Sequence, residues 1–203
     1  MPPSRFHNKF FGGIKSSSFA FVALLLIASL SLNILLGRRL RQLAILLPSQ
    51  QSPLEVGVAV PPIVAKGLDG RDQTITYIGS GRLTVLYVFT PQCAWCARNL
   101  DNLKALLKSK GAQERFVGLS LSQPGLADYV RANELTIPVL TALSADTIRA
   151  YRLGATPQTL VISPEGRVLE NWRGAWINKQ KSDIEVFFNV SLPGIQIASS
   201  SSH

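Results

Sequence analysis

Apolar and polar residues are distributed along this chain in two different patterns. Residues 16–37 form 22 consecutive residues without a charge, and most of them are apolar. From about Leu54 onward, short apolar runs alternate with segments in which apolar residues recur at helical spacing. The run LTVLYVF at residues 83–89 is continuous and rich in β-branched residues, which is typical of a strand buried on both faces. The pattern therefore predicts one long apolar helix followed by a globular α/β domain.

Strands and helices are predicted to alternate through the globular part. Pro124 is expected to open one helix and Ser144 to cap another. Ile184, Phe187 and Phe188 are expected to face inward from the last helix. The predicted order is a short hairpin or extended pair over 58–78, a strand over 83–89, a helix over 97–110, a strand over 115–122, a helix over 124–135, a strand over 138–143, a helix over 144–153, a hairpin over 158–172 and a helix over about 178–190.

These patterns divide the chain into five parts. They are a basic segment over 1–15, a membrane helix over 16–37, a linker over 38–53, a globular domain over 54–190 and a tail over 191–203 that is expected to be disordered. The linker contains PSQQSP, which is typical of an exposed turn. One domain of ordinary size therefore accounts for most of the chain.

The apolar segment at 16–37 has the length of a transmembrane helix. A helix of this length spans about 33 Å, which exceeds a hydrocarbon core of about 30 Å. A cleaved signal peptide is the alternative, but the apolar run continues past Ser29 and Ser31 and no A-x-A-like site follows. Three basic residues lie on each side of the segment, so the distribution of positive charge does not predict its orientation.

The net charge of +9 is concentrated near this helix. Residues 1–41 hold six basic residues and no acid, whereas the remaining 162 residues hold 15 basic and 12 acidic residues. Basic residues beside an apolar helix match anionic lipid headgroups. A nucleic-acid site would instead place a basic stripe on the folded domain, so we expect no nucleic-acid partner.

Both cysteines of the chain lie in one short motif, FTPQCAWCARNL, directly after the predicted buried strand. A redox cysteine reacts as the thiolate, and a helix N-terminus favours that negative charge. Cys93 would lie at such a terminus, and Cys96 would lie one turn later on the same side. Thiol–disulfide exchange needs an attacking thiol and a resolving thiol. We therefore predict that Cys93 attacks and Cys96 resolves.

Other uses of the two cysteines fit the sequence less well. A zinc site needs about four ligands, and the two histidines, His7 and His203, lie at the chain ends. A haem-attachment motif would place histidine after Cys96, where the chain has Ala97. A copper carrier would need a histidine in the domain. A purely structural disulfide would close only a short loop and stabilise little.

Two segments resemble a known family; they are VLYVFTPQCAWCARNL and YRLGATPQTLVISPEGRVL. The family is that of the thioredoxin-fold, membrane-anchored thiol–disulfide oxidoreductases of the bacterial cell envelope. These proteins are relatives of those that serve cytochrome c maturation. The resemblance covers about 54–190 and implies a thioredoxin-like fold with a central mixed sheet flanked by helices. It implies a cis bond between Thr156 and Pro157, which would join the substrate-binding site. It also implies protein substrates that carry a disulfide or thiols, a membrane redox partner, and a place in the bacterial inner membrane. No bound cofactor is expected, because the cysteine pair holds the electrons. Disulfide chemistry of this type favours a domain facing the periplasm or the outside.

The chain departs from this family at several positions near the motif. Thioredoxins have a buried acid where this chain has Tyr87, and some envelope relatives have glutamate where it has Asn99. The general base for Cys96 is therefore not identified. Trp95 is a candidate for the substrate-binding surface, although an aromatic residue that only covers the rim of the site fits equally well. Arg98 is a candidate to favour the thiolate, although a solvated helix arginine is commoner.

Two alternative functions remain open at the level of sequence. A thiol peroxidase is one, because the wider superfamily includes peroxiredoxins, but Leu86 stands where the peroxiredoxin motif has proline. A non-catalytic membrane-anchored adaptor with the same fold is the other. The intact C-x-x-C motif favours catalysis over this second alternative.

Overall fold

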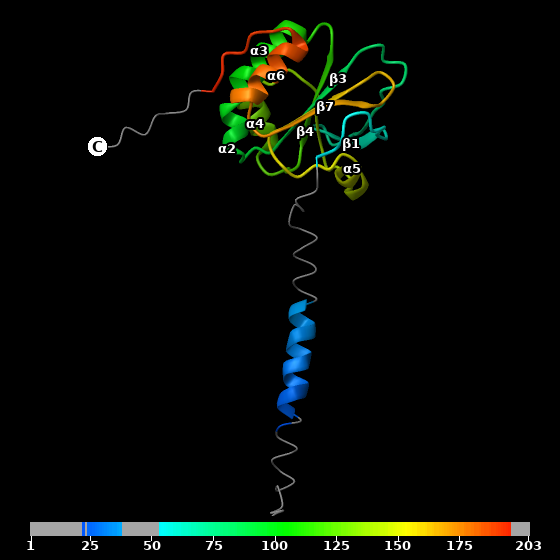
Figure 1. Cartoon of the computed structure of the whole chain (residues 1–203), viewed down its shortest axis with the longest axis vertical. Coiled ribbons are helices and arrows are strands. Elements are labelled where there is room, and N and C mark those ends of the chain that lie inside the picture. The colour runs from blue at the N-terminus through cyan, green and yellow to red at the C-terminus, as the bar shows by residue number, and fades with distance from the viewer. Residues whose placement is uncertain (1–21, 23, 38–52, 196–203) are drawn as a thin grey trace, which may run out of the picture. The chain divides into compact units, whose positions relative to one another are not determined.

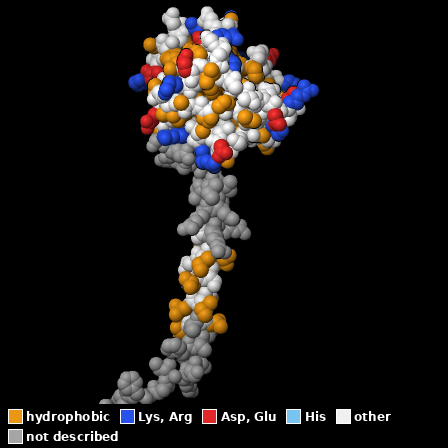
Figure 2. Space-filling model, turned by 90° about the vertical axis from the view of Figure 1, so that its right-hand side faces the viewer, with side chains coloured by type: hydrophobic (Ala, Val, Ile, Leu, Met, Phe, Trp, Pro, Cys, Tyr) orange, Lys and Arg blue, Asp and Glu red, His pale blue; other side chains and the backbone are white. Residues whose placement is uncertain are grey.

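The computed structural model describes residues 22, 24–37 and 53–195. The chain divides into two compact units, Met1–Ser49 and Gln50–His203, which are considered separately. In the first unit the described residues are helical, and their apolar side chains are exposed (Figure 2). Within the described ranges, no helix combines the length and the apolar character needed to span a membrane. The predictions for residues 1–15 and for most of the linker lie outside the described residues.

A seven-stranded mixed sheet forms the centre of the second unit in the part of the chain that is described (Figure 1). Its strands are β1 Ile63–Gly67, β2 Asp72–Ile75, β3 Thr84–Phe89, β4 Arg115–Ser120, β5 Val139–Thr141, β6 Gln158–Ile162 and β7 Val168–Arg173. They lie in the order β2-β1-β5-β4-β3-β6-β7. The pairs β3–β4 and β4–β5 are parallel, and the other neighbours are antiparallel. The predicted mixed sheet is confirmed, and so are both hairpins, β1–β2 and β6–β7.

The helices lie between the strands, as predicted, but several are shorter than expected. They are α2 Ala94–Arg98, α3 Leu100–Lys110, α4 Leu126–Ala132, α5 Ala145–Ala150 and α6 Asn178–Phe188. The single helix expected over 97–110 is wrong, because the chain breaks at Asn99 into α2 and α3. The helix expected from Pro124 begins two residues later, after Gly125 in the left-handed conformation at φ +72°. Ser144 caps α5 as predicted, because its side chain accepts a hydrogen bond from the Thr147 N–H at 3.1 Å.

The two faces of the sheet bury two separate hydrophobic clusters. Side chains alternate along β3, so Val85, Tyr87 and Phe89 face one side, while Leu86 and Val88 face the other. On the first face they pack with residues of α3, α4 and α6, which Figure 1 shows grouped on one side of the sheet. All six residues of β3 are buried, as the continuous apolar run predicts. This strand therefore fixes the position at which the cysteine motif begins.

The last helix packs on the sheet as the sequence predicts. Ile184 and Phe188 of α6 are buried, and Phe187 is partly buried against the same cluster. The ordered domain continues beyond residue 190, because Leu192 is buried and the Gly194 N–H donates to the Asn102 side chain at 2.8 Å. Residues 196–203 of the tail lie outside the described residues.

Two buried tyrosines form a polar contact on the second face of the sheet. The hydroxyls of Tyr77 and Tyr151 share a hydrogen bond of 2.7 Å, and the Tyr151 hydroxyl also donates to the Pro61 carbonyl. Burial raises the pKa of Tyr77 to about 12, so this hydroxyl stays protonated at neutral pH. The contact ties the segment after α5 to the segments that flank the β1–β2 hairpin.

We expect the change Tyr151→Phe to lower the free energy of unfolding by about 1–3 kcal/mol, because it leaves the Pro61 carbonyl and the Tyr77 hydroxyl without this partner. Tyr129→Phe is the matched control, since the buried Tyr129 hydroxyl has no hydrogen-bond partner among the described residues. That control should leave stability unchanged or raise it slightly. Equilibrium denaturation of both variants measures the difference, and equal losses would contradict this account of the tyrosine pair.

Candidate active site

The cysteine motif begins where the buried strand β3 ends. Thr90 to Gln92 form a turn, and the Cys93 N–H donates to the Thr90 carbonyl at 3.1 Å. Cys93 is then the N-cap of α2, with an extended backbone at φ −78° and ψ 107°. Its sulfur accepts a hydrogen bond from the Cys96 N–H at 3.0 Å. The N-terminus of α2 is therefore directed at the sulfur of Cys93, as the sequence predicts.

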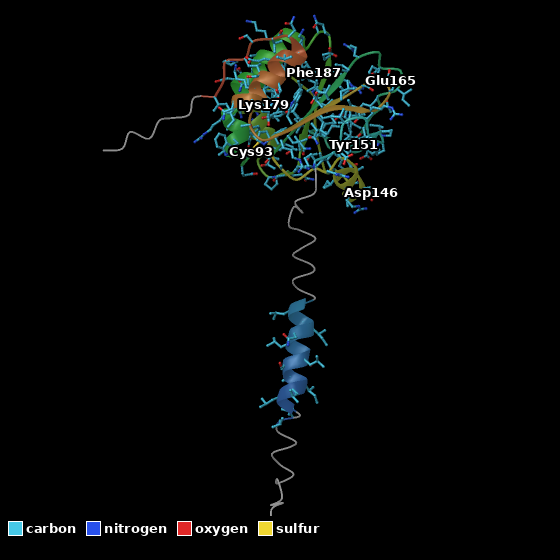
Figure 3. All side chains as sticks on the ribbon, in the orientation of Figure 1. Cys93, Asp146, Tyr151, Glu165, Lys179 and Phe187 are labelled. Atoms are coloured by element: carbon cyan, nitrogen blue, oxygen red, sulfur yellow. A yellow bond between two sulfur atoms is a disulfide. The ribbon has the colours of Figure 1, made fainter. Side chains whose placement is uncertain are left out.

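Cys93 and Cys96 form a disulfide, and their Cα atoms lie 5.2 Å apart. Cys96 is completely buried, whereas Cys93 is half-buried. Cys93 lies at the border of the domain, on the side of the helices (Figure 3). The sulfur that a second protein can reach is therefore that of Cys93. The other sulfur is held on the interior side.

A second segment of the site precedes β6. The peptide bond between Thr156 and Pro157 is cis, as the resemblance implies. Pro157 is buried and Thr156 is half-buried. The Gly174 N–H, at the end of β7, donates to the Pro157 carbonyl at 2.7 Å. This bond joins the cis-proline segment to the loop that leads into α6.

An open pocket of about 200 Å³ lies between these segments. Its lining residues come from α2, from the cis-proline segment and from the loop before α6; they are Trp95, Thr156, Gly174, Ala175 and Ile177. Trp95 is 42% exposed, so the largest apolar wall of the pocket is open to solvent. The guanidinium carbon of Arg98 lies 5.0 Å from the centre of the Trp95 ring. Arg98 therefore contacts Trp95, and no hydrogen bond or ion pair between it and Cys93 is among the described contacts.

A group of buried polar side chains lies in the interior next to α2. Asn99 is completely buried, and its amide donates a long hydrogen bond of 3.4 Å to the Tyr87 hydroxyl. Burial raises the pKa of Tyr87 far above its usual range, and the hydrogen bond from Asn99 only partly offsets this effect. Tyr87 therefore keeps its proton at neutral pH, and the Asn99 amide carries no charge. The two positions at which the family resemblance would place acids are joined here by one hydrogen bond between uncharged groups.

The structure brings together most of the residues that the sequence singled out. Cys93 and Cys96 are bonded to each other, and Trp95 and Thr156 line one pocket. Sequence reasoning missed the loop at 174–177 and the buried Trp176. The signal that could have found them is Gly174, which ends the predicted hairpin and is followed directly by Ala-Trp. Among the described residues, no group of three His, Cys, Asp or Glu residues is arranged to hold a metal ion.

Comparison with known proteins gives consistent matches. The chain matches the model of the AhpC/TSA family over residues 56–171, which is more than half of its length. It is 22% identical over 117 residues to sporulation thiol-disulfide oxidoreductase A of Bacillus subtilis, covering 54% of this chain and 70% of that protein. It is 23% identical over 124 residues to the thiol-disulfide oxidoreductase ResA of Geobacillus thermodenitrificans, covering 59% of this chain and 70% of that protein.

The fold is also found among solved structures. The thioredoxin domain of a thiol-disulfide oxidoreductase from Bacteroides vulgatus superposes with a TM-score of 0.54 at 19% identity, covering 67% of this chain and 99% of that domain. Together with the fold, the family match and the two curated relatives identify a thioredoxin-like thiol–disulfide oxidoreductase. The chain belongs to the AhpC/TSA family.

Proposed function

We propose that this chain is a membrane-anchored oxidoreductase that exchanges its Cys93–Cys96 pair with cysteines of protein substrates. The observation that carries the proposal is the hydrogen bond from the Cys96 N–H to the Cys93 sulfur at the start of α2. When the pair is reduced, this N–H and the end of the helix favour the Cys93 thiolate. The contrast between half-buried Cys93 and buried Cys96 supports the assignment of the attacking and resolving thiols.

In the reducing direction, the Cys93 thiolate attacks one sulfur of a substrate disulfide. A bond forms between Cys93 and that sulfur, the substrate disulfide breaks, and the first substrate thiolate leaves and takes up a proton. Cys96, once deprotonated, then attacks the Cys93 sulfur. The Cys93–Cys96 bond forms, the mixed disulfide breaks, and the second substrate thiolate leaves. Two electrons have then passed to the substrate, and the reverse steps oxidise a substrate dithiol.

The pocket beside the disulfide is proposed to receive the substrate segment. Trp95 and Thr156 line it, and buried Pro157 follows Thr156 directly. An extended substrate would place its cysteine at Cys93 and lie along the backbone before Pro157, in the manner of an added strand. No bound cofactor is needed, because the cysteine pair itself holds the two electrons.

The anchor is proposed from the sequence. The 22 uncharged residues at 16–37 have the length of a single membrane span. A dithiol–disulfide pair is maintained in an oxidising compartment more readily than in the cytosol. We therefore place the protein in a bacterial inner membrane, with the redox domain facing the periplasm or the outside. A second membrane protein would restore the redox state of the pair.

The variant Cys96→Ser tests the order of attack. The reduced full-length variant, mixed with oxidised insulin, should accumulate a mixed disulfide at Cys93, because no second thiol can release it. The variant Cys93→Ser should form no such adduct and should lose turnover. Non-reducing electrophoresis and peptide mass analysis measure both results. Full turnover without Cys93 would contradict the proposal, and rapid peroxide consumption that needs Cys93 would support a thiol peroxidase instead.

The location can be tested in bacterial cells that express the full-length chain. The protein should stay with the membranes after an alkaline wash, since an inserted apolar helix resists this treatment and a protein held at the surface by charge does not. A reagent that reacts with thiols and cannot cross the inner membrane should label the reduced cysteines of intact spheroplasts. Release of a shortened, soluble product would support the signal peptide, and labelling only after lysis would contradict the proposed orientation.

A further inference from the structure

Trp176 connects three segments that form the redox site. Its side chain is completely buried. Its backbone N–H donates to the Asn99 side-chain oxygen at 3.1 Å, directly after α2. Its indole N–H donates to the Thr159 hydroxyl on β6 at 3.1 Å. The Trp176 ring also lies edge-on to Tyr87, with the ring centres 6.2 Å apart.

Asn99 holds this tryptophan through its side chain. The Asn99 oxygen accepts hydrogen bonds from the Trp176 N–H and from the Asn102 amide, the latter at 3.2 Å. The Asn102 amide also lies 3.5 Å from the Trp176 carbonyl. Both backbone polar groups of Trp176 are therefore bound by two buried asparagines. Buried backbone groups need such partners, so the loop cannot move without losing them.

Asn99 is also bound to α2, which carries Trp95, the pocket wall that faces the loop of Trp176. It is the C-cap of α2, and its backbone N–H donates to the carbonyls of Trp95 and Cys96, each at 3.1 Å. Its side chain binds the loop in which Ala175 and Ile177 flank Trp176. Since Trp95, Ala175 and Ile177 are the apolar walls of the pocket, one buried residue connects both sides of it.

We propose that Asn99 is a positioning residue that sets the spacing between Trp95 and the loop at 175–177, and thereby the affinity for protein substrates. This inference rests on the proposed function. The walls are apolar, so the substrate class is an extended protein segment with an apolar side chain next to its reactive cysteine. Asn99 does not react with the substrate, and it acts through Trp176 and its two neighbours.

The test compares a large and a small disulfide in single-turnover reactions of the reduced full-length chain. Oxidised insulin requires the pocket, whereas the small reagent 5,5′-dithiobis(2-nitrobenzoic acid) requires only access to Cys93. Asn99→Ala should raise the insulin concentration that gives half the limiting rate by about tenfold, equivalent to ~1.4 kcal/mol of binding. The limiting rate, and the rate constant with the small reagent, should stay within about twofold, as expected when only binding is lost.

Two further variants separate positioning from general stability. Asn99→Asp keeps an acceptor oxygen for the Trp176 N–H. Unlike Asn99→Ala, it should therefore bind insulin nearly as tightly as the wild-type chain. Asn133→Ala removes an asparagine whose side chain donates to the Tyr129 carbonyl at the end of α4, and it should change neither reaction. If Asn99→Ala does not fold, Ile177→Ala removes the wall itself and should weaken insulin binding in the same way.

The results with these variants distinguish a failure of the proposed role of Asn99 from a failure of the proposed function. An unchanged half-saturating insulin concentration in folded Asn99→Ala or Ile177→Ala would overturn the inference. Equal slowing of insulin and the small reagent by Asn99→Ala would also overturn it, because Asn99 would then act through the cysteines. A wild-type chain that reacts with neither disulfide would instead contradict the proposed function, so the two failures are distinguishable.

Discussion

The contact between the N-terminus of α2 and the sulfur of Cys93 is the interaction on which the redox site depends. The N-terminal turn of a helix has N–H groups without partners inside the helix, and it favours negative charge nearby. Here the Cys96 N–H is directed at the Cys93 sulfur at 3.0 Å. The same geometry lets the two sulfurs bond in the oxidised form, and we propose that it favours the Cys93 thiolate in the reduced form. The rest of the domain holds this turn in place.

Two constraints fix the turn. The six buried residues of β3 anchor its beginning, because both faces of the strand are covered by the core. The break at Asn99 limits α2 to five residues, so the helix ends where the buried amide can bind Tyr87 and the loop of Trp176. A continuous helix would carry Asn99 as an ordinary internal residue. The short helix and the buried amide together join the cysteines to the pocket.

Local pattern was sufficient to predict the strands, the order of the elements along the chain and the placement of Cys93 at the start of a helix, whereas the mixed sheet followed from the family resemblance. The apolar run at 83–89, the cap at Ser144 and the cysteine spacing each act within a few residues, so they are visible in sequence. The break at Asn99 was missed because the leucines that predict the helix all follow it, and no proline or glycine interrupts residues 94–110. The partners of Asn99 are distant in sequence, since Trp176 lies 77 positions away, and no local pattern reports such a contact. The cis bond before Pro157 followed only from the family resemblance.

The central claim is that the Cys93–Cys96 pair cycles between dithiol and disulfide. The most direct measurement equilibrates the full-length chain in a series of thiol–disulfide buffers and counts free thiols by alkylation and mass. We predict one reversible transition in which both thiols are lost together, as a two-electron couple requires. A midpoint close to that of thioredoxin would indicate a reductant, and a much more oxidising midpoint would indicate a disulfide donor. If no reversible transition occurs, the disulfide is structural and the account is contradicted.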